Sequence, residues 1–175
     1  MVEEAKLKPT ENGLVPEGEG WFVVNAREAR WERNEAFGRW CRFEGEERFS
    51  HYGINLHVVE PGKPSCMYHG EDEQEDFLVL SGECLLIVEG EERRLRRWDF
   101  AHCPPWTEHV FVGVESGPCV ILMVGSRTPD AGVLYPVSET ALRQKAGVEQ
   151  ETRSGKEAYT GFPESREEPY QGVLD

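Results

Sequence analysis

The stretch "DFLVLSGECLLIVEGEERRL", residues 76–95, is divided by two glycines into three short segments. Gly82 and Gly90 stand where a tight turn needs a permissive backbone, so the stretch predicts three consecutive strands. Similar short runs flank it, "YGINLHVVE" at 52–60 and "CVILMVG" at 119–125. Strands that recur about every eight to twelve residues indicate an all-β sandwich or barrel.

The two ends of the chain have a different composition. Residues 1–20 are rich in Glu, Gly and Pro and predict a flexible N-terminal arm, after which the β-barrel is expected over 21–126. The segment from Trp31 to Phe43 fits a short helical turn followed by a strand, with undefined boundaries. Residues 127–175 predict a polar C-terminal extension with one short helix near 138–146, because Ser138 is a good N-cap residue.

Charge and length narrow the class of protein. The 175 residues suffice for one domain, and 33 acidic against 19 basic residues give a formal net charge of −14. Binding to nucleic acid or to an anionic membrane draws on cationic residues, so neither partner is expected. The sequence shows no apolar run of transmembrane length and no apolar signal core, which predicts a cytoplasmic protein. The five cysteines lack metal-finger spacing and are expected to be free thiols.

Acidic residues surround one histidine just before the quoted stretch, in "MYHGEDEQED" at 67–76. Strand alternation would put His69, Glu71, Glu73 and Glu75 on one face. A barrel can bring that face next to His109, and histidine with carboxylates is a donor set for a divalent transition metal. The alternative is a solvated acidic surface. The other histidines are interpreted as ordinary hydrogen-bonded side chains: His51, His57 and His102.

The spacing of these residues resembles the first signature motif of the cupin family. That motif runs Gly, His-x-His, three or four residues, Glu, six residues, Gly. Gly62 opens it here, His69 takes the first histidine position, Glu71 the second, Glu75 the glutamate and Gly82 the last glycine. The interval before the histidine is one residue longer than in the family, which suggests a bulge or a longer loop.

The second cupin motif is similar to residues 98–109. It runs Gly, five residues, Pro-x-Gly, two residues, His, and Pro104 and His109 fit it. Trp98 and Trp106 stand in place of its two glycines. The resemblance covers residues 52–126 and implies an antiparallel double-sheet jelly-roll barrel.

The resemblance implies a metal site and a small-molecule pocket. The metal, Zn, Mn, Fe or Ni, would be held by His69, Glu75 and His109, with Glu71 as a fourth ligand or a general base. The expected lining of the pocket is apolar apart from one thiol: Phe77, Val79, Phe111, Trp106 and Cys103. Cupins often dimerise, so a homodimer is expected, with aromatic residues of both arms laid across a second subunit.

Fold does not decide function in this family. One hypothesis is a metal-dependent oxygenase or isomerase that acts on a small molecule. A second is a non-catalytic binding or sensor module with a structural metal, and a third is a scaffold with an empty barrel. Whether the protein is an enzyme is left open by the residues.

Overall fold

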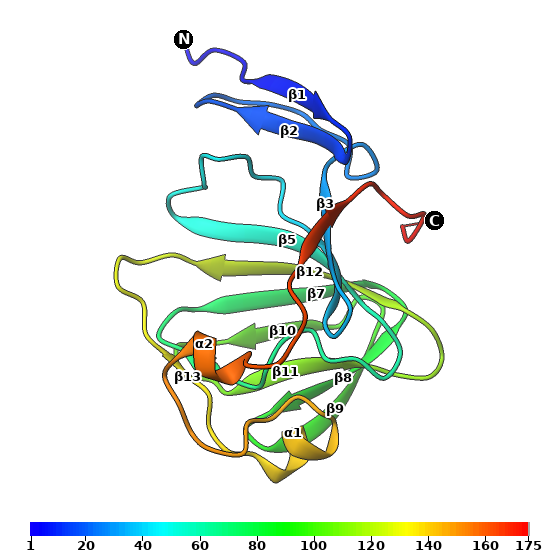
Figure 1. Cartoon of the computed structure of the whole chain (residues 1–175), viewed down its shortest axis with the longest axis vertical. Coiled ribbons are helices and arrows are strands. Elements are labelled where there is room, and N and C mark those ends of the chain that lie inside the picture. The colour runs from blue at the N-terminus through cyan, green and yellow to red at the C-terminus, as the bar shows by residue number, and fades with distance from the viewer. Residues whose placement is uncertain (175) are drawn as a thin grey trace.

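Two antiparallel sheets make up the body of the protein in the computed structural model, which describes residues 1–174 (Figure 1). The strands of the larger, seven-stranded sheet are, in spatial order, β10 (Phe100–Cys103), β7 (Glu75–Ser81), β12 (Cys119–Ser126), β5 (Tyr52–Val59), β4 (Gly38–Cys41), β3 (Trp31–Asn34) and β14 (Arg166–Glu168). The strands of the smaller sheet are β11 (His109–Gly113), β8 (Glu83–Val88) and β9 (Glu91–Arg96). The jelly-roll prediction is therefore confirmed.

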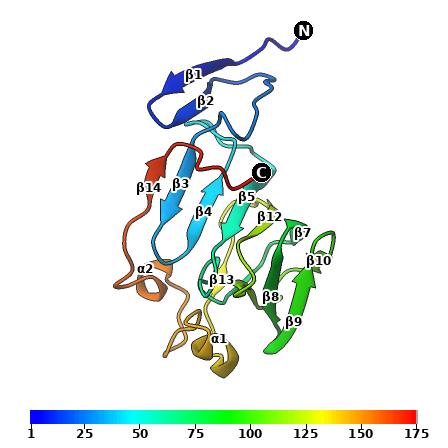
Figure 2. The ribbon, with the colours of Figure 1, turned by 90° about the vertical axis from the view of Figure 1, so that its right-hand side faces the viewer.

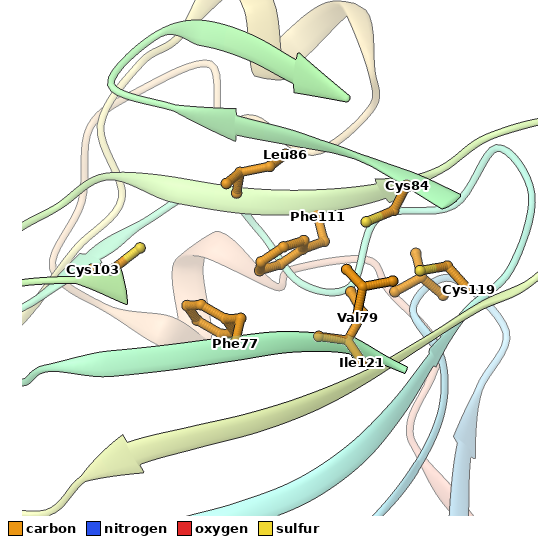
Figure 3. Packing of buried hydrophobic residues seen from close by; sticks show 9 residues of the cluster. Phe77, Val79, Cys84, Leu86, Cys103, Phe111, Cys119 and Ile121 are labelled. Atoms are coloured by element: carbon orange, nitrogen blue, oxygen red, sulfur yellow. The ribbon is translucent and has the colours of Figure 1, made fainter. Parts of the chain in front are cut away.

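The core lies between the two sheets (Figure 3). Alternation along β7 turns Phe77 and Val79 inward, where they meet Phe111 of β11. The remaining buried members of this cluster come from both sheets: Val59, Cys84, Leu86, Cys103, Cys119 and Ile121. Burial of these apolar side chains, each worth about 1.5–3 kcal/mol, holds the sheets together.

Left-handed backbone occurs at both positions where tryptophan replaces a motif glycine. Trp98 has φ 75° and Trp106 has φ 68°. A residue with a Cβ atom is strained in this region, by roughly 1–2 kcal/mol. Both tryptophans therefore occupy backbone conformations that normally favour glycine.

The N-terminal region is more ordered than its composition predicts. Instead of a loose arm, β1 (Lys6–Thr10) and β2 (Gly13–Glu17) form an antiparallel hairpin at one end of the molecule (Figure 2). A main-chain hydrogen bond also joins β2 to the segment that follows it, since the Leu14 N–H donates to the Glu28 carbonyl over 2.7 Å. Composition misses this hairpin because main-chain pairing needs no apolar side chains.

The segment after the hairpin also differs from expectation. Residues 31–34 and 38–41 are the paired strands β3 and β4, with no helical turn between them. Residues 21–26 form no strand and contain only an isolated bridge at Trp21. Trp31 is 1% exposed and lies 5.8 Å from the Tyr170 ring, so burial of its indole decides the local structure.

The C-terminal extension lies against the barrel of its own chain (Figures 1 and 2). Helix α1 (Glu139–Arg143) is capped by Ser138, as expected, and a second short helix follows, α2 (Gly155–Ala158). Between the barrel and α1, β13 (Val133–Leu134) pairs with β6 (Gly70–Glu71), and later β14 pairs with β3. Within residues 1–174, no helix has both the length and the apolar character needed to cross a membrane.

Candidate metal centre

Three side chains from separate segments meet at one end of the barrel. His69 lies just before β6, Glu75 begins β7 and His109 begins β11. The main chains of the two histidines exchange hydrogen bonds, with the His69 N–H donating to the His109 carbonyl over 3.2 Å and the reverse bond measuring 2.8 Å. This exchange fixes the two rings side by side, with centroids 5.1 Å apart.

The three side chains offer one ligand atom each within a small volume. These atoms all lie within 4.8 Å of one another, and His109 Nε2 is 3.2 Å from Glu75 Oε2. His69 and His109 are buried, while Glu75 is partly exposed at the barrel end. We call His69, Glu75 and His109 the His–Glu cluster.

Both imidazole rings are oriented by a main-chain carbonyl. His69 Nδ1 lies 2.7 Å from the Met67 carbonyl oxygen, and His109 Nδ1 lies 2.9 Å from that of Thr107. In each case the Nδ1–H donates, so a neutral ring has its lone pair on Nε2. Backbone acceptors of this kind are the usual way in which a protein orients metal-binding histidines.

Burial and charge together favour a positive ion in the cluster. Burial lowers the pKa of His109 to about 4 and raises that of Glu75 to about 7. Burial also opposes a charge on His69, but the negative potential of Cys66, Glu75 and Glu71 outweighs it and raises the pKa of His69 to about 10. The acidic surroundings that raise the pKa of His69 would equally favour the positive charge of a metal ion.

The run of acidic residues does not continue as one strand past His69. The chain bends at residues 72–74, between β6 and β7. Glu71 remains near the cluster, with Oε1 3.5 Å from His69 Nε2, although it lies outside the group of three close ligand atoms. Glu73 instead accepts a hydrogen bond from the Thr128 N–H.

Two other acids of this run have partners elsewhere. Asp72 Oδ1 accepts from the Gly132 N–H over 2.8 Å, and Asp76 pairs with His102 over 2.6 Å. Much of the acidic run is thus accounted for by hydrogen bonds near the surface. Only Glu71 and Glu75 approach a histidine of the cluster.

The side chains expected to line a pocket form the floor of the cluster or lie at its edge. Phe77 is 5.1 Å from the His109 ring and 4.8 Å from the Phe111 ring. Phe77, Phe111, Val79 and Cys103 are buried in the core between the sheets (Figure 3). The Trp106 side chain is 44% exposed, and the main-chain N–H of Trp106 donates to the Glu71 carbonyl. Their contact with a ligand remains a prediction.

Two further side chains border the His–Glu cluster. Tyr135 follows β13, and its ring lies 5.9 Å from that of His69. Cys66 Sγ lies 3.7 Å from His69 Nδ1, on the ring edge opposite Nε2. Nothing in the polar run around Tyr135 predicted the position of this ring, which depends on the pairing of β13 with β6.

Comparison with protein families gives one match. Residues 55–125 match the family model described as cupin domain. This range includes all three residues of the His–Glu cluster. A search of curated proteins gave no match.

Solved structures resemble the chain at low to moderate identity. A sugar phosphate isomerase of the cupin superfamily from Silicibacter pomeroyi is 24% identical, with 74% of this chain and 79% of that chain covered and a TM-score of 0.53. The polyketide cyclase RemF from Streptomyces resistomycificus is 16% identical, with 63% and 83% covered and a TM-score of 0.55. These likenesses support the fold.

A shorter match has higher identity. A protein from Acidithiobacillus ferrooxidans, provisionally assigned as a sugar phosphate isomerase, is 33% identical over 47% of this chain, with a TM-score of 0.46. The matched part spans 55% of that protein's length.

Proposed function

The chain carries a cupin domain over residues 55–125, and we propose that this domain binds a divalent transition metal through His69, Glu75 and His109. The observation that carries the proposal is the pair of buried imidazoles whose Nδ1 atoms face main-chain carbonyls. That arrangement aims two Nε2 lone pairs and one carboxylate at a common point. Zn, Mn, Fe and Ni all accept such a set of nitrogen and oxygen donors.

Glu71 is proposed as the fourth ligand or as a group that moves protons. Its carboxylate is near His69 Nε2 and is one-third exposed, so it can reach either the metal or a bound molecule. As a ligand it would bring a second negative charge and balance a divalent ion. As a base it would leave one face of the metal open to substrate.

The proposed activity is binding of a small molecule at this end of the barrel, with oxygenase or isomerase chemistry as the catalytic possibility. A bound metal would supply Lewis-acid or oxygen-binding chemistry. The protein would supply the apolar floor of Phe77 and Phe111, which excludes water, and the Glu71 carboxylate. The alternative function is a non-catalytic binding or sensor module with a structural metal.

Metal analysis tests the site. Protein purified without added metal is expected to contain close to one equivalent of a transition metal by elemental analysis. His109→Ala removes a buried ligand and should reduce the metal content sharply. His102→Ala is the matched control, because His102 is exposed and pairs with Asp76 outside the His–Glu cluster. An equal metal content in parent and His109→Ala would refute the site.

The homodimer also remains a proposal. Aromatic residues expected to lie across a second subunit contact their own chain instead, since Phe162 lies 4.8 Å and Tyr159 5.3 Å from the Phe37 ring. Trp21 is 51% exposed and stays available for contact between subunits. A monomer mass by light scattering at micromolar concentration would contradict the dimer.

A further inference from the structure

A cavity lies on the flank of the barrel, beside the proposed metal centre but outside it. Its volume is about 570 Å³, which is within the usual size range of small-molecule sites. Its walls come from β4 and β5, from the loop at Ser65 and Cys66, and from residues 159–165 of the C-terminal extension. None of the residues of the His–Glu cluster lines it. We call it the flank cavity.

The flank cavity belongs to the inner face of the large sheet. Asn55 and His57 of β5 pair with Met123 and Ile121 of β12, and directly paired residues share a face. Ile121 is a member of the core between the sheets. This wall of the cavity therefore lies on the same face of the large sheet as the apolar core.

Two polar atoms in its wall have no partner. Within residues 1–174, Trp40 Nε1 and Asn55 Oδ1 are buried without a hydrogen bond. An unpaired buried polar group costs about 1–3 kcal/mol, so such atoms call for an explanation. One atom is a donor and the other an acceptor, and a hydroxyl group is the simplest ligand group that satisfies both. Both atoms are screened from solvent, so a bound hydroxyl requires their side chains to turn slightly toward the cavity.

The wall also provides apolar and aromatic surface. The rings of Phe37, Tyr159 and Phe162 pack together, with centroids between 4.8 and 6.3 Å apart. The Trp40 and His57 rings stack at 5.7 Å. Burial keeps His57 uncharged, with its pKa lowered to about 4, and its Nε2 lies 2.8 Å from the Phe37 carbonyl. Flat aromatic surface beside unpaired polar atoms suits a ring with both C–H and O–H groups.

Charge argues against an anionic ligand. Arg42 is the only lysine or arginine among the residues that line the cavity, and it pairs with Glu32 over 3.0 Å. Glu164 adds a carboxylate to the lining. A phosphate or carboxylate would therefore find no free cation among these lining residues.

We infer that the flank cavity is a binding site for a neutral, hydroxyl-rich small molecule of monosaccharide or cyclitol size. The C-terminal extension completes the site, because Asn34 Nδ2 donates to the Pro163 carbonyl over 2.7 Å and the Met67 N–H donates to the Tyr159 hydroxyl over 3.2 Å. The flank cavity is distinct from the proposed metal centre. Cys66 lines the cavity and contacts the Nδ1 edge of His69, whereas His69 itself does not line the cavity.

The test is a titration of the full chain, treated with a chelator, with D-glucose, D-ribose and myo-inositol, each at millimolar concentration. Backbone and indole N–H resonances are followed by two-dimensional NMR. At least one of the three probes should shift the Trp40 indole resonance in a saturable way and leave that of the exposed Trp98 unmoved. If no probe perturbs the Trp40 indole, the inference is wrong.

Two variants sharpen the test. Trp40→Phe keeps a ring but removes the N–H, and Asn55→Leu removes the acceptor at similar volume. Each should weaken binding of the responding probe about tenfold, which is the effect of one lost hydrogen bond. Trp98→Phe is the matched control and should bind as the parent does. Unchanged binding in both cavity variants would overturn the inference.

Charge and metal give independent readouts. D-gluconate should bind more weakly than D-glucose, and tighter gluconate binding with the same Trp40 shift would contradict the neutral ligand class. Probe binding should be the same with and without chelator. A metal-free protein that binds the probe would support the flank cavity even if the proposed metal function failed, so the two failures are distinguishable.

Discussion

Glu75 of the His–Glu cluster shares the inner face of the large sheet with Asn55 and His57 of the flank cavity, but the two regions differ in how their polar atoms are satisfied. In the cluster, each imidazole has a carbonyl partner and a carboxylate nearby. In the cavity, a buried donor and a buried acceptor have none. The comparison separates two imidazole rings that are already oriented by carbonyl partners from a cavity wall whose buried donor and acceptor still lack partners.

The largest expected effect separates the two regions through the metal. Glu75→Gln keeps the shape of the side chain but removes its charge, so metal affinity should fall by roughly 100-fold in competition with a chelator. Probe binding in the flank cavity should not change. Asp76→Asn makes the same chemical change one residue along the strand, where the side chain pairs with His102, and should retain the metal. An equal loss of metal affinity in both variants would mean that the overall negative charge of this region, and not a specific set of ligands, holds the ion.

A second prediction concerns an ion pair that lies outside both regions. Glu44 follows β4 and binds Arg127, just past β12, with Nη1 to Oε1 at 2.6 Å and Nη2 to Oε2 at 3.1 Å. Glu44→Gln should lower the free energy of unfolding by about 2 kcal/mol at neutral pH, as measured by urea denaturation. Metal content and probe binding should stay as in the parent, because neither site contains this pair.

The pH dependence of that difference has a definite sign. Burial would raise the pKa of Glu44, but the Arg127 guanidinium and the Phe49 N–H outweigh it and hold the pKa below its ordinary value. Stabilisation is therefore complete above the pKa of the unfolded chain and is lost as the pH falls through the lower pKa of the folded protein. The stability difference between parent and Glu44→Gln should shrink in acid. A difference that grows in acid would contradict this account.

A third prediction concerns a substitution that should destabilise the wall of the flank cavity alone. Asn34 is 5% exposed, donates to the Pro163 carbonyl and accepts from the Ala36 N–H over 2.9 Å. Asn34→Ala removes these two bonds and a third from Nδ2 to Ser165 Oγ over 3.3 Å, and it should lower the free energy of unfolding by about 1–3 kcal/mol. Hydrogen exchange should increase in residues 159–165 more than at His69 or His109. Exchange that increases equally at both places would show that the two regions do not behave separately.

The smallest expected effect concerns Glu71. If it is a ligand, Glu71→Gln should weaken metal binding about tenfold, and Glu71→His should retain the metal with the family's usual donor at that position. If Glu71→Gln binds metal as tightly as the parent, the ligand assignment is wrong and the residue is left as a proton-transfer group or a surface acid. Glu73→Gln is the control, since Glu73 bonds the Thr128 N–H instead.

The cluster was more predictable than the cavity for a physical reason. Strand periodicity and turn glycines indicated β7, β8 and β9, and two spaced motifs indicated His69, Glu75 and His109. The expectation of one continuous face from His69 to Glu75 missed the bend at 72–74, which Asp72 stabilises through Gly132. The cavity joins residues 34–66 to 159–165, and no local pattern in either segment specifies the other.

The pairing of β14 with β3 has a consequence for the order of assembly. Arg166 lies opposite Arg33, so the outer edge of β3 remains uncovered until residues 166–168 have left the ribosome. Contacts this distant in sequence form slowly, because a long loop must close first. A nascent chain paused before residue 166 would expose the β3 edge to strand pairing with other chains, and a stalled or truncated product should aggregate through that edge.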